Sequence, residues 1–525
     1  MRGWLWAAAL FVALMGPPVS AKTFRWASDG DLRSLDPYAG RETFLRSFDA
    51  NIYEPLVRRG RDLALEPALA TNWANPAPER WRFNLRQGVV FQDGTPFSAA
   101  DVLFSFARAR APTSKLAGVV APIKEVLQVD DHTIEILTIG ADPILPDELT
   151  EWGIMSRAWC EAHDATEPAE RGHGEESYAT DHANGTGPFM LATRTPEVET
   201  VLVPNPRWWD ERHFDLDKAV FLPVPDDEVR VAELVSGTLD MIYAVPPQDI
   251  DRIARTQGLH IVQGPELRTI FLGFDQHSAE LADSDVKGRN PYKDRRVREA
   301  FYRAIDEHEI AGTVMRGLAT PSALMVAPGI NGFDRALDKR LPYDPAAARR
   351  LLAEAGYANG FTTGMDCPSD RYVNDEAICR AVAAMLAKVG VTVDIEAQGR
   401  AQFFAKLFRA NYRTSFFLFG WTPTTYDALD MLTNLAATPD PAAHAGDFNF
   451  GGYSNRALDA LIARIEGETK RDARLALLRE ALKLLQDDVA FIPLHQQDVV
   501  WAARDGVELV QRADDAFPLR YVRLK

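Results

Sequence analysis

The sequence predicts an α/β protein built from more than one lobe. Its 525 residues exceed what one hydrophobic core usually serves. Alternating apolar residues in the N-terminal third indicate strands. After Phe271, long helical patterns alternate with short apolar strands, an order typical of right-handed parallel crossovers. These three observations favour a strand-rich first part and an α/β second part.

The N-terminus predicts a secretory signal peptide over residues 1–21. Arg2 supplies a positive charge, an apolar run extends from Leu5 to Met15, and small residues precede and include Ala21. The run is shorter than the roughly 20 residues that a membrane span requires. We therefore expect cleavage after Ala21 and release into the periplasm, with a retained anchor as the alternative.

The N-terminal third combines short strands with one helix. Strands are predicted where apolar residues alternate, at Phe24 and Trp26 and at Trp81, Phe83 and Leu85. A helix is predicted from Ser98, because Asp101 three residues later completes a capping box. The segment from about 160 to 185 is polar and aperiodic, which indicates a surface excursion.

The C-terminal half alternates helices with strands. Helical spacing of apolar residues predicts a helix over 297–305. A second helix starts after Asp344, with a proline at its first position and a glycine at its end, and another follows over 374–390. The run V-T-V-D-I-E-A then predicts a strand, A-Q-F-F-A-K-L-F-R a helix, and S-F-F-L-F a strand ahead of Gly420. Two final helices, at 454–466 and about 471–487, lead to the strand-like F-I-P-L-H.

Composition excludes several partners. Acidic residues number 75 against 58 basic ones, for a net charge of -17, which argues against nucleic acid and anionic membrane surfaces. The sequence contains no G-x-S-x-G, H-E-x-x-H, phosphate-loop or G-x-G-x-x-G motif. It therefore gives no positive case for an enzyme, and we expect no catalytic residue and no cofactor.

Metal binding and disulfide formation each leave two interpretations. His163, His173 and His182 share an acidic segment that could hold a metal, but a solvated loop is the favoured interpretation, and no metal site is expected. Cys367 and Cys379 lie twelve residues apart and could pair in an oxidising compartment. Three buried thiols are the alternative.

A ligand site is indicated where the last predicted parallel strand ends. Ligands of open α/β sheets bind beyond the carboxyl ends of the strands, and Gly420, Trp421 and Thr422 follow such a strand. Glycine lets a ligand approach the backbone, and tryptophan offers a rigid surface with one N–H donor. The alternative is a core tryptophan.

The run L-R-Q-G-V-V-F-Q-D-G-T-P-F-S-A-A-D-V at 85–102 resembles the signature of family 5 extracellular solute-binding proteins, which include periplasmic dipeptide- and oligopeptide-binding proteins. Further stretches match in the same order: Y-E-P-L-V at 53, G-T-G-P-F at 185, N-P-R-W-W at 205, L-V-S-G-T-L-D-M-I at 234, F-L-G-F at 271, P-Y-K-D-R-R-V-R-E-A-F at 291, F-G-W-T at 419 and I-P-L-H at 492. The resemblance covers essentially the whole mature chain.

The resemblance implies a two-lobed periplasmic-binding-protein-like fold of class II, large type. Lobe I would comprise 22–62, 185–270 and 488–525, with 63–184 as its accessory subdomain. Lobe II would comprise 271–487, and the chain crossings near 270 and 487 would form the hinge.

The resemblance also implies ligand-binding residues between the lobes. The tryptophan of the family's G-W motif packs on the ligand, and Trp421 matches it. In the peptide-binding branch an aspartate three residues later pairs with the ligand's amino group, but this chain has Thr424 there. A buried ammonium without an anionic partner is costly. Asp427 matches the next acidic position and could substitute, whereas Asp430 lies farther along the chain, and Tyr426 belongs to the same expected site.

Two further positions come from the resemblance. Arg409 matches a position where some oligopeptide binders hold the ligand's carboxylate; a solvated helix position is the alternative. Tyr38, in L-D-P-Y, matches the first cleft-lining loop and is expected in its wall, while Asp36 and Pro37 could form a turn.

The implied function is the periplasmic substrate-binding component of an ABC import system. It would capture a peptide or peptide-like nutrient between closing lobes and deliver it to an inner-membrane permease, acting as a monomer without catalysis. The alternative is a non-peptide ligand, such as an opine or a sugar conjugate, bound for import or sensing.

Overall fold

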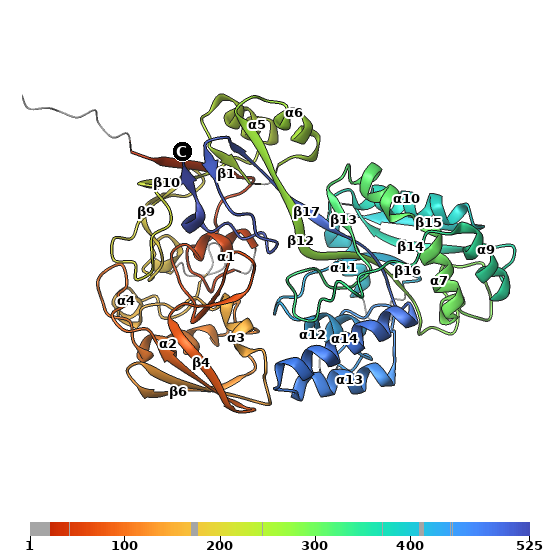
Figure 1. Ribbon diagram of the computed structural model, residues 1–525, viewed down its shortest axis with the longest axis horizontal. Helices are drawn as coiled ribbons and strands as arrows, with labels where there is room; N and C mark the ends of the chain where they lie inside the picture. The colour runs from red at the N-terminus through yellow and green to blue at the C-terminus, as the bar shows by residue number, and fades with distance from the viewer. Residues whose placement is uncertain are drawn as a thin grey trace, which may run out of the picture.

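The computed structural model describes residues 21–40, 43–169, 177–243, 245–369, 371–408, 414–441, 443 and 445–525. The expected signal peptide before Ala21, Arg409 and His173 lie outside these residues. Two bodies stand side by side, joined by the long strands β12 and β17 (Figure 1).

One mixed sheet runs through both bodies in the order β15-β14-β16-β12-β17-β11-β1-β10-β9-β8, with β13 beside β17. Its strands are β1 (Thr23–Ser28), β8 (Phe189–Thr195), β9 (Glu199–Pro204), β10 (Lys218–Pro223), β11 (Met241–Ile242), β12 (Leu259–Phe274), β13 (Ala319–Pro321), β14 (Phe361–Pro368), β15 (Val391–Gln398), β16 (Phe416–Trp421) and β17 (Ile492–Arg504). Strands β12 and β17 have 16 and 13 residues and pair antiparallel. Because strands extend about 3.3 Å per residue, both are long enough to cross from one body to the other.

Lobe I packs helices on both faces of its part of the sheet. Successive residues of one strand enter different cores: Trp26 joins the core that includes Phe48 of α1, and Ala27 joins the core under α5 and α6. The helices are α1 (Thr43–Asp49), α5 (Asp227–Ser236) and α6 (Ile250–Ala254). Strands β18 (Val507–Glu508) and β19 (Arg523–Leu524) pair near the C-terminus.

The accessory subdomain is a four-stranded antiparallel sheet in the order β4-β5-β7-β6 with helices against it. Its elements, with the short hairpin that leads into it, are β2 (Val57–Arg59), β3 (Leu65–Pro67), β4 (Ala70–Ala77), β5 (Arg80–Leu85), β6 (Ile123–Asp130), β7 (Thr133–Thr138), α2 (Ala99–Ala109), α3 (Leu145–Glu148) and α4 (Arg157–Ala162). The capping box predicted before α2 is confirmed, because the Ser98 amide donates to the Asp101 carboxylate at 2.9 Å.

The predicted surface excursion is partly wrong. Cys160 is a buried, unpaired thiol on α4, and Ala165 and Ala179 are also buried, because short apolar residues anchor the segment to the accessory core. His163 and His182 stack on the two sides of Tyr178, with ring centroids 4.4 and 3.7 Å away. Within the described ranges no group of three or more potential metal ligands gathers.

Lobe II has the predicted parallel crossovers. Strand β14 pairs parallel with both β15 and β16, and β16 pairs antiparallel with β12. The helices are α7 (Arg295–Ala304), α8 (Glu307–Glu309), α9 (Pro345–Glu354), α10 (Asp375–Ala387), α11 (Arg400–Leu407), α12 (Ala428–Met431), α13 (Arg456–Gly467) and α14 (Arg471–Asp488). On β16, Phe416 and Leu418 enter the core under α7, α9 and α10, while Phe417 and Phe419 enter the core under α11 to α14. The period of two along a strand thus separates the two helical layers.

Of the two interpretations of the cysteines, the structure shows the disulfide between Cys367 at the end of β14 and Cys379 on α10. Residue 270 lies within β12 and residue 487 in the last turn of α14. The lobe boundaries placed at these two residues stay predictions. Over the described part of the chain, no helix combines the length and apolar character needed to cross a bilayer.

Candidate ligand-binding site

Trp421 is the last residue of β16, at the carboxyl ends of the three parallel strands. It is half-buried, its indole Nε1 donates to Asp430 Oδ1 at 2.7 Å, and its ring meets the edge of Phe448. A Cβ on Gly420 would lie 2.8 Å from atoms of Ile270 and Tyr372, so this close approach requires glycine. The strand end therefore presents a braced aromatic surface.

Asp430 is the acidic residue that organises this strand end. Besides the indole, its carboxylate accepts the Thr424 hydroxyl at 2.8 Å and the Thr424 amide at 3.2 Å. Burial raises the pKa of Asp430, and the hydrogen bonds from Thr424 and Trp421 oppose that rise. The turn between β16 and α12 brings Asp430 back to the strand end, which its distance along the chain does not reveal.

Asp427 requires a correction. The expectation that it could receive a ligand's ammonium is not supported, because its side chain is fully buried. Both carboxylate oxygens accept from Arg474 of α14, at 2.6 and 2.9 Å, and one also caps α12 at Leu429. Asp427 holds two helices of lobe II together and has no surface toward a ligand.

Tyr426 lies at the contact between the lobes. Its hydroxyl donates to Asp514 of lobe I at 2.8 Å, and the Arg59 guanidinium lies 4.1 Å from its ring centroid. Burial raises the pKa of this hydroxyl, so it stays a neutral donor. Its φ of 57° lies in the left-handed region, a conformation that costs a non-glycine residue about 1–3 kcal/mol and clusters at functional sites.

Tyr38 also requires a correction. It is fully buried rather than exposed on a cleft wall, and its hydroxyl donates to the Gly153 carbonyl at 2.8 Å. The reason is the preceding turn: the Asp36 carboxylate accepts from the Tyr38 amide and forms a buried ion pair with Arg108. The turn interpretation of Asp36 therefore holds, and the loop points Tyr38 inward.

The sequence patterns did not identify two arginines of this region as candidate site residues. Arg371 follows β14, and Arg268 lies on β12, where it pairs with Glu266 at 2.9 Å. Burial lowers the pKa of Arg371, and the positive charges of Arg268 and of Arg400, just after β15, lower it further. The signal that could have found Arg371 and Arg400 is their position directly after parallel strands.

The neighbouring Tyr372 fixes this group to the strand end. The Gly420 amide donates to the Tyr372 hydroxyl at 2.9 Å, and the Arg371 guanidinium lies 5.0 Å from the Tyr372 ring. A basic cluster thus lies beside the aromatic surface of Trp421, and guanidinium groups of this kind suit a carboxylate.

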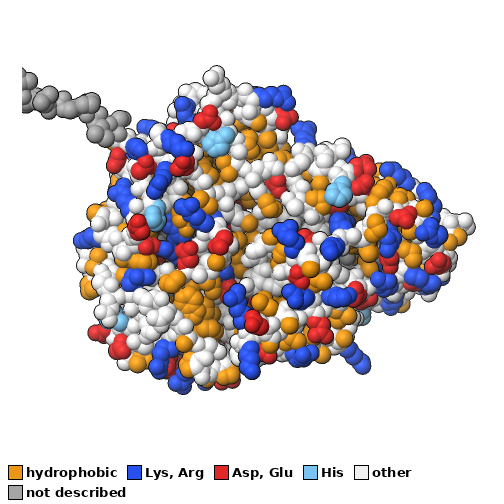
Figure 2. All heavy atoms as spheres, viewed as in Figure 1, with side chains coloured by type: hydrophobic (Ala, Val, Ile, Leu, Met, Phe, Trp, Pro, Cys, Tyr) orange, Lys and Arg blue, Asp and Glu red, His pale blue; other side chains and the backbone are white. Residues whose placement is uncertain are grey.

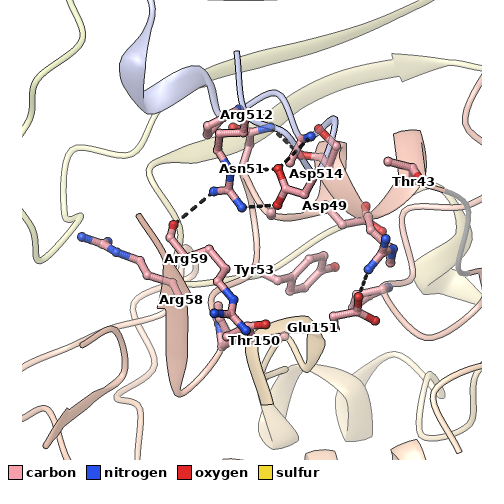
Figure 3. Close-up of a pocket in the computed structure, with 18 of the residues that line it drawn as sticks. Thr43, Asp49, Asn51, Tyr53, Arg58, Arg59, Thr150, Glu151, Arg512 and Asp514 are labelled. Carbon is pink, nitrogen blue, oxygen red and sulfur yellow. Dashed lines mark hydrogen bonds and ion pairs between the residues drawn. The ribbon is translucent and has the colours of Figure 1, made fainter. Parts of the chain in front are cut away.

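A polar cavity of about 130 Å³ faces Tyr426 from lobe I. Its wall combines residues of α1 and β2, the 3-10 turn and following segment at 150–153, and the C-terminal segment near Arg512 (Figure 3). A separate hollow of about 570 Å³ is lined by Asp147 of the accessory subdomain and by Asn331 and Arg474 of lobe II. The two bodies therefore enclose space between them.

Fold and geometry together define a two-lobed binding protein whose candidate site lies where the lobes meet. The family model for bacterial extracellular solute-binding proteins, family 5 Middle, matches residues 64–442, and the chain belongs to this family. It is a solute-binding protein of the kind that serves ABC importers.

Similar proteins match this chain along nearly its whole length, in sequence or in fold. The glutathione-binding protein GsiB of Salmonella typhimurium is 26% identical over 510 residues, which cover 95% of this chain and 94% of that protein. The structure of HbpA2 from Haemophilus parasuis has a TM-score of 0.82 at 21% identity and covers 96% of this chain and 100% of that one. The periplasmic binding protein DppA from Helicobacter pylori, in complex with the peptide STSA, has a TM-score of 0.70 at 22% identity, covering 96% and 98%.

Proposed function

We propose that this protein captures a peptide-like solute bearing a carboxylate and delivers it to the permease of an ABC importer. The observation that carries the proposal is that the chain neighbours of two arginines contact the end of β16: the Gly420 amide donates to the hydroxyl of Tyr372, which follows Arg371, and Thr269, which follows Arg268, pairs with Trp421. The GsiB relative is named for binding glutathione and the DppA structure contains a peptide, so a peptide-like ligand fits the family.

Each side chain has a distinct part in this proposal. The Trp421 ring packs on the ligand's apolar surface, and its N–H is held by Asp430, which fixes the ring's orientation. Arg371 and Arg268 bind a ligand carboxylate through charge-assisted hydrogen bonds, which are stronger than neutral ones. Tyr372 couples the arginine cluster to the strand end.

Thr424 affects how the site can recognise the ligand's amino group. The position carries a hydroxyl that already donates to Asp430, so it offers no carboxylate to an ammonium. We expect recognition to depend on the ligand's carboxylate more than on a free α-amino group. A modified peptide or an opine meets that requirement as well as a simple peptide does, and the experiments below separate them.

Closure follows from the contact between the lobes. Tyr426 bridges to Asp514 and Arg59 of lobe I, and ligand contacts to both lobes would favour the closed form over the open one. A micromolar dissociation constant, about -8 kcal/mol, suffices for capture. We further propose that the mature protein begins after Ala21, acts as a monomer in the periplasm and performs no catalysis. Figure 2 shows acidic and basic side chains interspersed over one face, with no broad basic surface there of the kind nucleic acid requires.

The first experiment is mass spectrometry of small molecules released on denaturing protein isolated from its natural periplasm. Peptide-like carboxylic acids are the expected result. A ligand without a carboxylate would contradict the proposal, whereas an opine would keep the carboxylate site and change the ligand class.

The second experiment is calorimetric titration of the identified ligand, with glutathione as the starting probe. We expect Trp421→Ala and Arg371→Gln each to weaken binding by about thirtyfold or more, the scale of a binding hot spot. Arg380→Gln is the matched control, because its side chain is 72% exposed and pairs only locally with Glu376. Equal affinities for R371Q and R380Q would sink the arginine assignment.

Thr424→Asp tests the amino-group argument. It restores the acid found in the peptide-binding branch but places it beside Asp430. We expect a gain for peptides with free amino termini and a loss for ligands without an ammonium. A gain for both classes would show that Thr424 does not set specificity.

A further inference from the structure

The small cavity in lobe I collects buried polar atoms that have no protein partner. Five of its lining side chains contribute such an atom: Arg46 Nε, Asp49 Oδ1, the Tyr53 hydroxyl, Arg59 Nε and Arg520 Nε. Asp49 and Tyr53 are 4% and 2% exposed. Leaving a buried polar group unpaired costs about 1–3 kcal/mol, so this concentration indicates a space made for a polar guest.

The unpaired atoms are almost all hydrogen-bond donors. Three are guanidinium nitrogens, which can only donate, and the Tyr53 hydroxyl can donate as well. Burial raises the pKa of Asp49 well above its usual range, the charge of Asp36 raises it further, and the charge of Arg194 lowers it. A guest that matches these walls must bring acceptor oxygens.

The charged side chains of the cavity wall also favour a guest with acceptor oxygens. Arg46 pairs with Glu151, Arg59 with Asp147, Arg512 with Asp514, and Arg58 with Asp210. Arg520 differs, because among the described residues no carboxylate pairs with it; it donates to the Arg59 carbonyl at 3.0 Å and to the Tyr521 hydroxyl at 2.9 Å.

Two other guanidinium groups, those of Arg58 and Arg512, lie near Arg520, and Asp210 is a carboxylate whose pKa the Arg520 charge lowers. The Arg59 carbonyl that accepts from Arg520 also accepts from Arg512, so two guanidinium groups meet at one oxygen. Burial lowers the pKa of Arg520, and the charges of Arg58 and Arg512 lower it further. An anion beside Arg520 would relieve this repulsion.

We propose that this cavity is a binding site for one small oxyanion group, a carboxylate or a phosphate, held by Arg520 and Tyr53. Its volume of about 130 Å³ is close to that of cavities of ~150 Å³ that accept benzene, which leaves room for a group of about that size. The group comes either from the transported solute or from a free anion, and in the first case the inference rests on the function proposed above.

Tyr426 ties this site to lobe closure. It lines the cavity from lobe II, while its hydroxyl and ring contact Asp514 and Arg59 of the same wall (Figure 3 shows both lobe I residues). An anion in the cavity therefore lies against the residue that joins the two lobes.

The test compares Arg520→Gln with Arg61→Gln in the mature protein. Arg61 also stacks on Tyr521 but does not line the cavity, so it is the matched control. For a free anion, millimolar inorganic phosphate raises the melting temperature of wild type and R61Q but not of R520Q. For a solute-borne group, glutathione binds R520Q at least tenfold more weakly than R61Q, and esterifying its carboxylates weakens binding to wild type but not further to R520Q.

The outcomes separate this inference from the proposed function. If glutathione binds none of the variants, the phosphate comparison alone decides the cavity. If R520Q is folded and neither phosphate nor glutathione distinguishes it from R61Q, the cavity is not an anion site.

A second variant and a direct measurement cover the case in which R520Q does not fold. Tyr53→Phe removes one donor and should weaken whichever probe binds several-fold. Anomalous diffraction from wild-type crystals soaked in sodium selenate should give a peak in contact with Arg520. Saturating selenate without such a peak overturns the proposal.

Discussion

The two lobes differ in how they satisfy the buried polar groups that face each other. Around Trp421 in lobe II, Asp430 accepts three hydrogen bonds and Asp427 is held by both arms of Arg474. In the lobe I cavity, Asp49 and Tyr53 are buried with an oxygen that has no protein partner. The difference teaches that the two acidic groups behind Trp421 are held by the protein's own hydrogen bonds, although the Thr422 and Thr425 hydroxyls nearby have no partner, whereas Asp49 and Tyr53 keep hydrogen-bonding capacity for a guest.

Replacing one arginine with leucine in each lobe tests this difference between the lobes most directly. Arg474→Leu leaves the Asp427 carboxylate buried and unpaired, so we expect the free energy of unfolding to fall by about 3–5 kcal/mol. Arg520→Leu removes a guanidinium that lacks a carboxylate partner among the described residues, and we expect a change within about 1 kcal/mol. Urea denaturation of the ligand-free proteins measures both, and equal losses would contradict the distinction.

The disulfide offers a covalent test of lobe II. Cys367 and Cys379 close a short loop between β14 and α10, with a sequence separation of 12. Chain-entropy arguments give about 3 kcal/mol for a loop of this size, so the double variant C367S/C379S should lose about that much. Thermal unfolding with and without reductant measures this loss. Cys160→Ser is the control, because Cys160 forms no disulfide. If reductant still destabilised C367S/C379S, the stability loss would not come from this disulfide.

The third prediction concerns pH and lobe I. Burial raises the pKa of Asp515 to about 7, and the charges of Glu266 and Asp514 add to the rise. The folded state therefore binds this proton more tightly than the unfolded state. Its contribution is fully present below about pH 4, declines as pH rises, and is lost by about pH 7.

Asp515→Asn should remove this dependence. We expect D515N to be more stable than wild type by about 1–2 kcal/mol at pH 8, after allowance for solvent screening, and to show a flatter stability profile between pH 4 and 7. Unfolding curves over that range measure it. The exposed Asp505 provides the control D505N, and identical profiles for D515N and D505N would rule out the assignment.

The smallest expected effect belongs to the residue that joins the two lobes. Tyr426→Phe deletes one hydrogen bond to Asp514 and keeps the ring under Arg59, so we expect a loss of about 1 kcal/mol. Small-angle scattering should show a more open average shape than wild type. Tyr343→Phe, at a residue 42% exposed, should change neither quantity; an unchanged scattering curve for Y426F would remove Tyr426 from the closure mechanism.

Much of lobe II could be predicted because its signals are local. The alternation of helices and strands implied the parallel order of β14, β15 and β16, and the strand end pointed to Trp421. The two site predictions that failed, at Tyr38 and Asp427, share one cause, although the Asp36 turn also directs Tyr38 inward. Each side chain is buried by a partner distant in sequence, Gly153 for Tyr38 and Arg474 for Asp427, and no local pattern encodes such a partner.

The sequence by itself determined the family, the two-lobed α/β architecture and the strand end that carries Trp421, because periodicity and motif order are properties of neighbouring residues. Only the tertiary structure decided which polar groups are satisfied. Asp430 returns to Trp421 through a turn, and the lobe I cavity assembles α1, β2, the loop near Gly153 and the segment near Arg520. Hydrogen-bond satisfaction and charge balance depend on distances between segments far apart in the chain, and folding alone sets those distances.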